Sequence, residues 1–321
     1  MLDVRKLRLL RELAIRGTIA GVAEALSFSP SSVSQQLAAL ERESGVKLLR
    51  KVGRRVQLTP QAELLAARTA DLLDLLEQAE SELDASLDTV TGAVRIAVFQ
   101  SAAHAIVPGA LSILSAEYPD LRVEVTERAP ERGLFEVSAR DFDLVIAEQY
   151  PGSTRGLRAD LDRVDLVTDA IHLATPPPAS GRAAIGELRD AAERPWVMEP
   201  EGTASRTWAV QLCRSAGFEP DVRFETADLI AHIRLIRSGN AVGLLPDLVW
   251  AGDAPTVALA ELPGSPRRTI FTSSRRSSAA RPGVLACRDA LTRAAQDATR
   301  SAGPAARPAA GHAARQHPGP A

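Results

Sequence analysis

Cysteine is nearly absent from this 321-residue chain, which contains only Cys213 and Cys287, far apart and without metal-ligand spacing around them. Neither a disulfide scaffold nor a zinc site is therefore expected, and no cofactor is predicted. No apolar run approaches the roughly 18–20 residues that span a membrane. The opening stretch MLDVRKLRLLRELAIRG lacks the continuous apolar segment of a signal peptide. We therefore expect a cytoplasmic protein with no membrane partner.

Signatures of the common enzyme classes are missing as well. The sequence has no nucleophile elbow, P-loop or metal-binding spacing, and His104, His172 and His232 are scattered. The stretch VFQSAAHA, at the end of the first strand expected in the body, lacks the glycines of a dinucleotide site. Catalysis is therefore not predicted.

Lysine is scarce, and all three lysines (Lys6, Lys47 and Lys51) lie in the first 60 residues. That block holds 11 Lys and Arg against 5 Asp and Glu, whereas residues 61–90 hold one Arg against 8 acidic residues. The net charge of −2 therefore conceals a basic head on an acidic body. Such a distribution predicts a polyanion as the partner of the head alone.

Helical periodicity is evident in the head. Apolar residues at three- and four-residue steps predict a helix over residues 3–16. Gly17 then ends that helix, and Thr18 caps a second one. After the short break Ser27–Ser29, Pro30 fits the first position of a third helix, where its missing N–H costs nothing. Two helices joined by so short a break are typical of a helix-turn-helix.

The third helix has an uncharged outer face. At about 100° per residue, Val33, Leu37 and Leu40 point inward. The opposite face carries small and polar side chains: Ser31, Gln35, Ala38 and Arg42, flanked by Ser32 and Ser34. No charged residue occurs between Pro30 and Leu40, whereas a solvated helix face usually carries charges. Because Ser and Gln both donate and accept hydrogen bonds, this face suits the base edges of the DNA major groove.

A basic hairpin follows the third helix. Two short strand-like segments flank Gly53 within residues 46–58, and Lys47–Arg55 contains five basic residues and no acidic one. A basic hairpin beside a DNA-reading helix is a wing, whose targets are phosphates or the minor groove. The alternative is an ordinary solvated loop.

A long linker helix is predicted next. Thr59 and Pro60 repeat the cap-and-proline start, and the chain then runs without Gly or Pro, so we expect one helix from Gln61 to about Val90. Its apolar residues follow an imperfect 3-4 alternation: Leu65, Leu72, Leu76, Ala79, Leu83 and Val90. Such a stripe needs a partner, and pairing of two such helices would dimerise the heads. The alternative is packing against its own chain alone.

The stretch AEALSFSPSSVSQQLAALERESGVKLLRKVGRRVQLTPQAELL resembles the amino-terminal signature of LysR-type transcriptional regulators. The resemblance implies double-stranded DNA as the partner, and Ser29 corresponds to the N-cap serine of the reading helix. The other implied DNA-binding residues are Ser31, Ser34 and Gln35 in the groove with Ser32 beside them, Arg42 near the backbone, and Arg54 and Arg55 in the wing. Pro30 departs from the family, which often has glutamine there, so that side-chain contact is lost.

From residue 91 the chain alternates strands and helices, which predicts an α/β body. A first βαβαβ series implies a parallel sheet: Val94–Phe99, Ala105–Tyr118, Leu121–Thr126, Glu131–Ala139 and Phe142–Ala147. A second series predicts another lobe: Ile171–Ala174, a helix near Ile185–Ala191, Trp196–Met198, Ala204–Ala216, Val222–Glu225, Leu229–Ser238 and Ala241–Leu245. Strand Arg268–Ser273 and helix Pro282–Ala298 return to the first lobe. Two such lobes leave a cleft for a small ligand between them.

Two stretches of the body resemble the effector-binding domain of the same regulators, which is itself similar to periplasmic solute-binding proteins. They are GAVRIAVFQSAAHAIVPGALSILSAEYPDLRVEV and EPEGTASRTWAVQLCRSAGFEPDVRFETADLIAHIRLIRSGNAVGLLPDLV. The resemblance implies a metabolite as effector, dimers through the linker helix that assemble into homotetramers, and RNA polymerase as a further candidate partner.

The predicted organisation has four parts. They are a winged helix-turn-helix domain over residues 1–60, a linker helix over 61–90, a two-lobed α/β effector-binding domain over 91–298 and a tail over 299–321. The first lobe comprises about 93–164 and 266–298, and the second about 165–265. The tail is expected to be disordered, because it is rich in Pro, Gly and Ala and poor in large apolar residues.

Helix starts at the cleft supply the candidate effector-binding residues. They are Gln100, Ser101, Thr203 and Ser205, with Glu148 and Asp228 as further candidates. Free N–H groups and hydroxyls at helix starts favour an anion or carboxylate, and the resemblance places the first four residues at the effector site. The acid at Glu148 would instead suit an amine. Helix capping or solvation is the alternative for all six.

An α/β enzyme, or an export-independent small-molecule-binding protein with an incidental basic head, is the alternative function. A transport protein with these lobes would need export and no basic head. An architectural DNA-binding protein would need no cleft. A one-component transcriptional regulator accounts for all the parts together.

Overall fold

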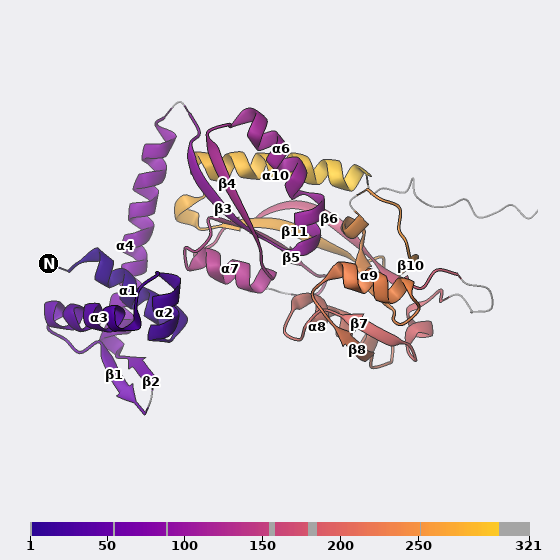
Figure 1. The fold of residues 1–321 in the computed structure, drawn as a ribbon, viewed down its shortest axis with the longest axis horizontal. Coiled ribbons are helices and arrows are strands. Elements are labelled where there is room, and N and C mark those ends of the chain that lie inside the picture. The colour runs from indigo at the N-terminus through magenta and orange to yellow at the C-terminus, as the bar shows by residue number, and fades with distance from the viewer. Residues whose placement is uncertain are drawn as a thin grey trace, which may run out of the picture.

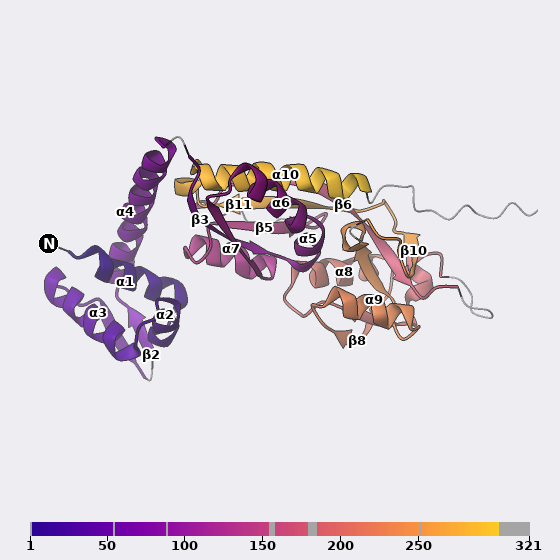
Figure 2. The same cartoon turned by 45° about the horizontal axis from the view of Figure 1, so that its top comes forward.

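The computed structural model describes residues 2–53, 55–87, 89–153, 158–178, 185–250 and 252–301. A small helical head, one long helix and a two-lobed α/β body follow one another in space as they do in the sequence (Figure 1). In both views the long helix α4 stands beside the first lobe, and the second lobe lies on the far side of the first (Figure 2). The head and the second lobe are therefore at opposite ends of the molecule.

Helix caps set the boundaries within the head. It contains α1 (Val4–Arg16), α2 (Ile19–Ala25), α3 (Pro30–Ser44) and a hairpin of β1 (Leu49–Val52) and β2 (Arg55–Leu58). The side chains of Asp3, Thr18 and Ser29 each accept a hydrogen bond from an amide in the first turn of the helix that follows. Gly17 and Gly45 end α1 and α3 with positive φ, which a residue without Cβ adopts freely. The predicted helix-turn-helix and hairpin are confirmed.

Helix α4 (Pro60–Ala85) is shorter than predicted. It ends at Ser86, whose amide turns back to a carbonyl three residues earlier, so Val90 lies beyond the helix and packs on the core of the first lobe. Ala62, in its first turn, is buried in the core of the head. Glu77, nearer its end, is bonded to Arg275 of the first lobe. One side of α4 thus packs against its own chain along most of its length.

The first lobe is built on three parallel strands. They are β3 (Gly92–Val98), β4 (Leu121–Glu127) and β5 (Leu144–Gln149), and the accompanying helices are α5 (Gln100–Ala105), α6 (Val107–Glu117), α7 (Pro130–Ser138) and α10 (Pro282–Ser301). The predicted βαβαβ series is confirmed. The helix predicted over Ala105–Tyr118 corresponds to α6, which begins two residues later because the chain breaks at Ile106, after the short helix α5. Pro108 then lies in the first turn of α6, where no N–H is needed.

One strand joins the two lobes. Strand β6 (Val164–Thr175) has 12 residues and extends well beyond the predicted strand Ile171–Ala174. Its first half pairs antiparallel with β11 (Arg267–Ser274). Its second half pairs antiparallel with β9 (Gly243–Pro246) and β10 (Ala258–Glu261), and of these two strands β10 was not predicted. The strand order β10-β6-β11-β5-β3-β4 therefore runs through both lobes.

The second lobe adds a small parallel sheet. Its further elements are β7 (Pro195–Met198), β8 (Asp221–Glu225), α8 (Ala204–Ser215), α9 (Leu229–Arg237) and the short 3-10 helices η1 (Leu188–Ala191) and η2 (Asp247–Trp250), while η3 (Arg276–Ser278) follows β11. The helix predicted near Ile185–Ala191 is only the single turn η1. The turn begins only after Glu187, whose backbone is extended and which forms a capping box with Asp190.

The predicted tail and the predicted absence of a membrane-spanning segment concern the end of the chain and its apolar helices. Residues 299–301 of the predicted tail belong to α10, and residues 302–321 lie outside the described residues. Within the described ranges, no helix is both long enough and apolar enough to cross a membrane.

Candidate DNA-binding face and effector cavity

The predicted reading face of α3 is exposed to solvent. Its outermost side chains are Ser31, Ser34, Gln35 and Arg42. Ser29 and Ser32 lie at its edge and are used within the helix. Ser29 Oγ accepts from the Ser32 amide at 3.1 Å, and Ser32 Oγ accepts from Gln36 Nε2 at 3.3 Å. Between Pro30 and Leu40 this face carries small, uncharged side chains, which permit the close approach that contact with base edges requires.

Glu41 fixes the wing to the reading helix. One carboxylate oxygen accepts from the amides of Leu48 and Leu49 at 2.8 and 3.1 Å, and the other accepts from Lys47 Nζ at 3.4 Å. Burial opposes ionisation of Glu41, but these donors lower its pKa below the ordinary value. The hairpin therefore holds a defined position beside α3.

The wing presents basic residues to solvent. Arg50 and Lys51 are exposed on β1. Of the two predicted wing arginines, Arg54 lies outside the described residues, and Arg55 begins β2 with a side chain that is also outside the description. The described part of the wing thus offers positive charge next to an uncharged reading helix.

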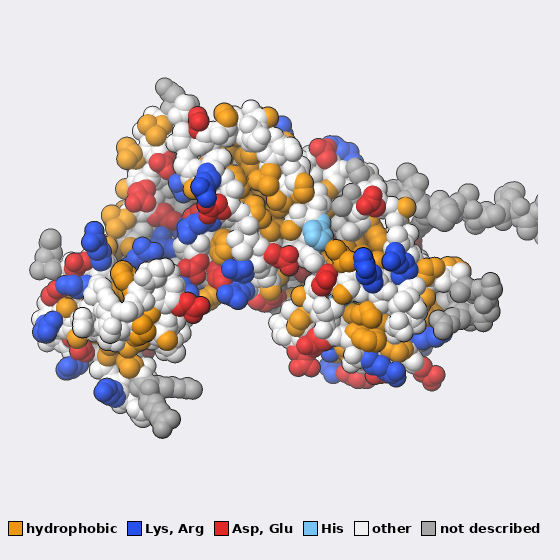
Figure 3. Space-filling view, viewed as in Figure 1, with side chains coloured by type: hydrophobic (Ala, Val, Ile, Leu, Met, Phe, Trp, Pro, Cys, Tyr) orange, Lys and Arg blue, Asp and Glu red, His pale blue; other side chains and the backbone are white. Residues whose placement is uncertain are grey.

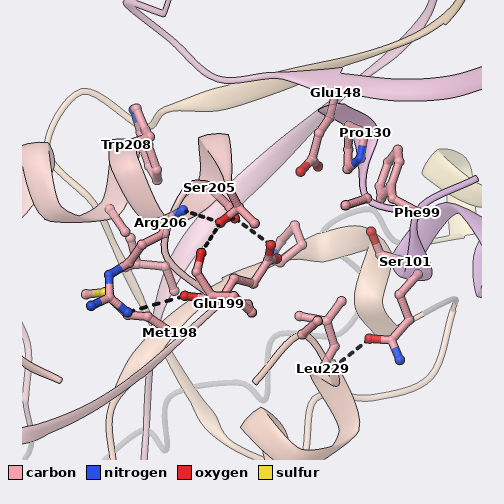
Figure 4. Close-up of a pocket in the computed structure, with 18 of the residues that line it drawn as sticks. Phe99, Ser101, Pro130, Glu148, Met198, Glu199, Ser205, Arg206, Trp208 and Leu229 are labelled. Carbon is pink, nitrogen blue, oxygen red and sulfur yellow. Dashed lines mark hydrogen bonds between the residues drawn. The ribbon is translucent and has the colours of Figure 1, made fainter. Parts of the chain in front are cut away.

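A cavity of about 270 Å³ lies between the two lobes (Figure 4). The junction of β3 and α5 contributes Phe99 and Ser101, and β5 contributes Glu148. From the second lobe, the junction of β7 and α8 contributes Glu199 and Ser205. The carboxyl ends of parallel strands therefore face the cavity from both sides, which is the usual location of ligands in α/β folds.

Two hydrogen bonds between side chains and backbone cross the cleft. Gln100 Oε1 accepts from the amide of Leu229 at 2.7 Å, and Glu131 Oε1 accepts from the amide of Ala204 at 3.2 Å. These amides belong to the first turns of α9 and α8, where backbone donors have no partner inside the helix. Side chains of the first lobe thus cap both helices of the second lobe and hold the lobes together.

Arg268 is buried against the cavity with 3% of its surface exposed. Its guanidinium donates to Asp169 at 2.7 and 3.0 Å, to Ser101 Oγ at 2.8 Å and to Glu148. Burial opposes its charge, but the Glu148 and Asp169 carboxylates raise the pKa of Arg268. One arginine therefore serves two carboxylates, which leaves this cluster with an excess of negative charge.

Glu199 directly follows β7 and lines the same cavity. Its hydrogen-bond donor is a hydroxyl rather than a cation, since Ser205 Oγ donates to Glu199 Oε2 at 2.6 Å. Burial raises the pKa of Glu199 to about 7, and the charge of Glu148 contributes to this rise. The protonated form of this carboxyl group is therefore favoured relative to that of an exposed glutamate.

His232 of α9 is a third buried polar group at the cavity, 3% exposed. Its Nε2 lies 2.8 Å from the Thr226 carbonyl, which only accepts, so Nε2 carries the hydrogen. Burial lowers the pKa of His232, which keeps the imidazole neutral and makes Nδ1 an acceptor. This Nδ1 has no hydrogen-bond partner among the residues described.

The structure brings five of the six sequence-predicted effector residues to the cavity wall: Gln100, Ser101, Glu148, Thr203 and Ser205. Asp228 is not among the lining residues and caps α9 by accepting from the amides of Ile230 and Ala231. Thr203 lines the cavity and also caps α8, through the amide of Arg206. Contact of these residues with an effector stays a prediction.

Sequence reasoning missed Glu199, His232 and Arg268. Glu199 had a usable signal, because it directly follows a predicted strand at the edge of the sheet where ligands bind. Arg268 had none, since its partners lie 99, 120 and 167 residues away. Among the described residues, no group of three or more His, Cys, Asp or Glu side chains is placed to hold a metal ion.

Two family models match the chain. The LysR substrate binding domain matches residues 88–296, and the bacterial regulatory helix-turn-helix protein of the lysR family matches residues 4–63. The chain therefore belongs to the LysR family. It is a DNA-binding transcriptional regulator with an effector-binding domain, as the sequence predicted.

Individual relatives agree with this assignment. GltC, a transcriptional dual regulator of Bacillus subtilis (strain 168), is 29% identical over 256 residues, which cover 79% of this chain and 84% of GltC. A mutant OxyR of Corynebacterium glutamicum is 25% identical and covers 94% of both chains with a TM-score of 0.55. Full-length CbnR in complex with its target DNA is 20% identical, covers 91% of this chain and 100% of its own, and shares the fold with a TM-score of 0.52.

Proposed function

We propose that the chain binds double-stranded DNA through α3 and the wing, senses a small molecule in the inter-lobe cavity, and alters transcription in response. One observation carries this proposal: an exposed, uncharged reading face and a cavity lined by buried polar groups occur on one chain and are connected by α4. The proposed DNA-binding residues are Ser29, Ser31, Ser32, Ser34, Gln35, Arg42, Arg54 and Arg55. The proposed effector-binding residues are Gln100, Ser101, Glu148, Thr203 and Ser205.

A second copy of the chain is the proposed partner of α4. The side of α4 that faces away from the head and the first lobe exposes large apolar side chains: Leu64, Leu72, Leu75, Leu76 and Leu83. In Figure 3 the orange side chains follow the outer edge of this helix. Full burial of a leucine contributes about 1.5–3 kcal/mol, so paired helices would gain substantially. Such dimers, assembled further into tetramers, would place two copies of α3 along one DNA.

Strand β11 supplies a route from the cavity to the head. Arg268 near its start belongs to the cavity cluster, and Arg275 near its end pairs with Glu77 of α4 at 2.6 Å. An effector that binds one arrangement of the lobes more tightly shifts the population toward it. We infer that β11 transmits such a shift to α4 and changes the spacing of the paired heads.

We propose a cytoplasmic regulator without catalytic activity, and thiol-based peroxide sensing is not favoured. One of the similar structures, a mutant Corynebacterium glutamicum OxyR, is H2O2-bound, which makes peroxide sensing the alternative. In this chain Cys213 and Cys287 are fully buried in separate cores, and burial raises the pKa of each thiol to about 12. The thiolate is the reactive form, so neither cysteine is suited to that chemistry.

Selection of bound sequences from random DNA, followed by titrations with the full chain, tests the DNA-binding face. Gln35→Ala is expected to relax base preference at one position, with about 1–3 kcal/mol lost on the preferred site. Arg42→Ala is expected to weaken all sequences alike and to reduce the salt slope by about 1. Gln78→Ala, an exposed change on α4, is the control. Unaltered DNA binding in both head variants would exclude this face.

A further inference from the structure

One buried acceptor among the described residues that line the cavity has no hydrogen-bond donor. His232 Nδ1 is an acceptor with no partner among the described residues, and only 3% of the residue is exposed. A buried acceptor without a donor costs about 1–3 kcal/mol. A bound molecule that donates an N–H or O–H to Nδ1 would remove this penalty.

One carboxyl group of the same cavity has no cation paired with it. Glu148 shares the buried Arg268 with Asp169, whereas the carboxylate of the half-buried Glu199 accepts from the Ser205 hydroxyl. Two further arginines line the cavity and serve other acceptors. Arg128 Nε donates to Glu136 at 3.0 Å, and Arg206 Nη1 donates to the Glu199 carbonyl at 3.3 Å and lies 3.9 Å from Glu225. Within the described part of the chain, none of the three arginines that line the cavity donates to the Glu199 carboxylate.

Groups that would receive an anion are already engaged. Arg268 makes four hydrogen bonds to protein acceptors. The first-turn amides of Ala204 and Leu229 are held by Glu131 and Gln100 of the first lobe. Helix α5 also starts at the cavity, but it has only six residues. The structure thus weighs against the anion that the helix starts suggested in the sequence.

Aromatic and apolar side chains form much of the remaining wall. Trp208 lines the cavity and stacks on Tyr150, with ring centres 5.2 Å apart. Met198, Leu229 and Leu244 add apolar surface. The faces of aromatic rings attract cations, and the apolar surface suits a hydrocarbon body. The volume of about 270 Å³ falls below the usual range of about 300–1,000 Å³ for drug-sized ligands, so the molecule is small.

We propose that the effector of this regulator is a small organic cation, an amine with an apolar body, whose ammonium group pairs with Glu199 and donates a hydrogen bond to His232. This inference rests on the proposed effector role of the cavity. It places a salt bridge at a half-buried carboxyl group whose side-chain donor in the described structure is the Ser205 hydroxyl. It also uses the aromatic side chain of Trp208, which lines the same cavity as Glu199 (Figure 4).

Probe pairs of matched shape and opposite charge test the proposal with the full chain. The pairs are n-butylammonium with n-butyrate and 2-phenylethylammonium with 3-phenylpropionate, followed by calorimetric titration and by the melting temperature. We expect the ammonium member of each pair to bind at least tenfold more tightly. Glu199→Gln should abolish this preference, and His232→Phe should weaken the ammonium probe several-fold. Glu201→Gln, an exposed change two residues from Glu199, is the matched control and should retain the preference.

Outcomes of these titrations separate the ligand class from the regulator function. Tighter binding of the carboxylates, equal binding within each pair, or no binding of either ammonium probe would overturn the cationic effector. Retention of the preference in Glu199→Gln would overturn the role of that residue. DNA binding by the same samples is measured in parallel. Intact DNA binding with a failed ammonium preference leaves the proposed function standing, whereas loss of DNA binding by the unaltered chain would overturn it.

Discussion

Strand β11 carries a buried arginine near its start and is followed by another directly after its end, and the two arginines lie in different charge environments. Arg268 borders the cavity, and Arg275 lies at the contact between the first lobe and α4; they are 3% and 4% exposed. Arg275 pairs with Glu77 and also donates to two backbone carbonyls at 2.7 Å each. Arg268 is shared by two carboxylates, while Glu199 in the same cavity is bonded to a hydroxyl.

The pKa values of two glutamates express this difference. Burial opposes ionisation of Glu77, but the hydrogen bond and charge of Arg275 lower its pKa from 4.5 to about 2. Burial raises the pKa of Glu199 from 4.5 to about 7. Burial thus raises the pKa of both acids, and only at Glu77 does a paired cation outweigh it. Glu77 is paired with Arg275 of the same chain, whereas the donor to Glu199 in the described structure is the Ser205 hydroxyl.

The largest expected effect comes from removing the arginine of the cavity. Arg268→Met leaves Glu148 and Asp169 buried without a cation, which is expected to lower the free energy of unfolding by about 3–5 kcal/mol. Urea unfolding followed by tryptophan fluorescence measures it, because all three tryptophans lie between Trp196 and Trp250. Arg267→Met, the exposed neighbour, is the control and should cost about 1 kcal/mol or less. A comparably small loss at Arg268 would show that these carboxylates do not depend on it.

Glu199→Gln is expected to change the pH dependence of stability next most strongly. Because folding raises the pKa of Glu199, its contribution to stability is complete below pH 4.5 and is lost as the pH rises through about 7. The neutral glutamine has no such loss. The free energy of unfolding of the variant, relative to that of the natural chain, should therefore increase between pH 4.5 and 8, by up to about 3 kcal/mol. Urea unfolding across this range tests it, and parallel curves for the two chains would contradict the raised pKa.

Glu77→Gln is expected to have a moderate effect of opposite sign. Its lowered pKa gives stability that is present above pH 4.5 and is lost as the pH falls toward 2. With allowance for solvent screening, the loss at pH 7 should be about 1–2 kcal/mol. Hydrogen exchange of the α4 amides at pH 7 and pH 4 measures it, and the difference between variant and natural chain should narrow in acid. Glu80→Gln, exposed on the same helix, should show no such change.

Local patterns in the sequence predicted the structural features that depend on neighbouring residues. The caps at Thr18, Ser29 and Thr59 and the periodicity of α3 act within a few residues, and the structure contains them as predicted. The parallel strands of the first lobe were also predictable, because a strand, a helix and a second strand imply their own geometry.

The remaining features depend on contacts between distant parts of the chain. Strand β6 extends into the first lobe because β11, about 100 residues later, pairs with it, and no local pattern announces that pairing. The same pairing brings Arg268 to Asp169, and the far end of β11 leads to the contact of Arg275 with Glu77 of α4. The linker helix was predicted to need a partner for its apolar stripe. The acidic side of α4 has a partner in the same chain, since Glu77 pairs with Arg275 of the first lobe.

The smallest expected effect concerns the bond that closes the cavity. Gln100→Ala removes the acceptor of the Leu229 amide, and water replaces it, so the free energy of unfolding should fall by only about 0.5–1.5 kcal/mol. Because this bond joins the two lobes, the clearer change should be faster hydrogen exchange at the start of α9. Local opening there requires less free energy than global unfolding. Gln211→Ala, exposed on α8, should leave that exchange unchanged. If Gln100→Ala also leaves it unchanged, the bond from Gln100 does not hold the start of α9 to the first lobe.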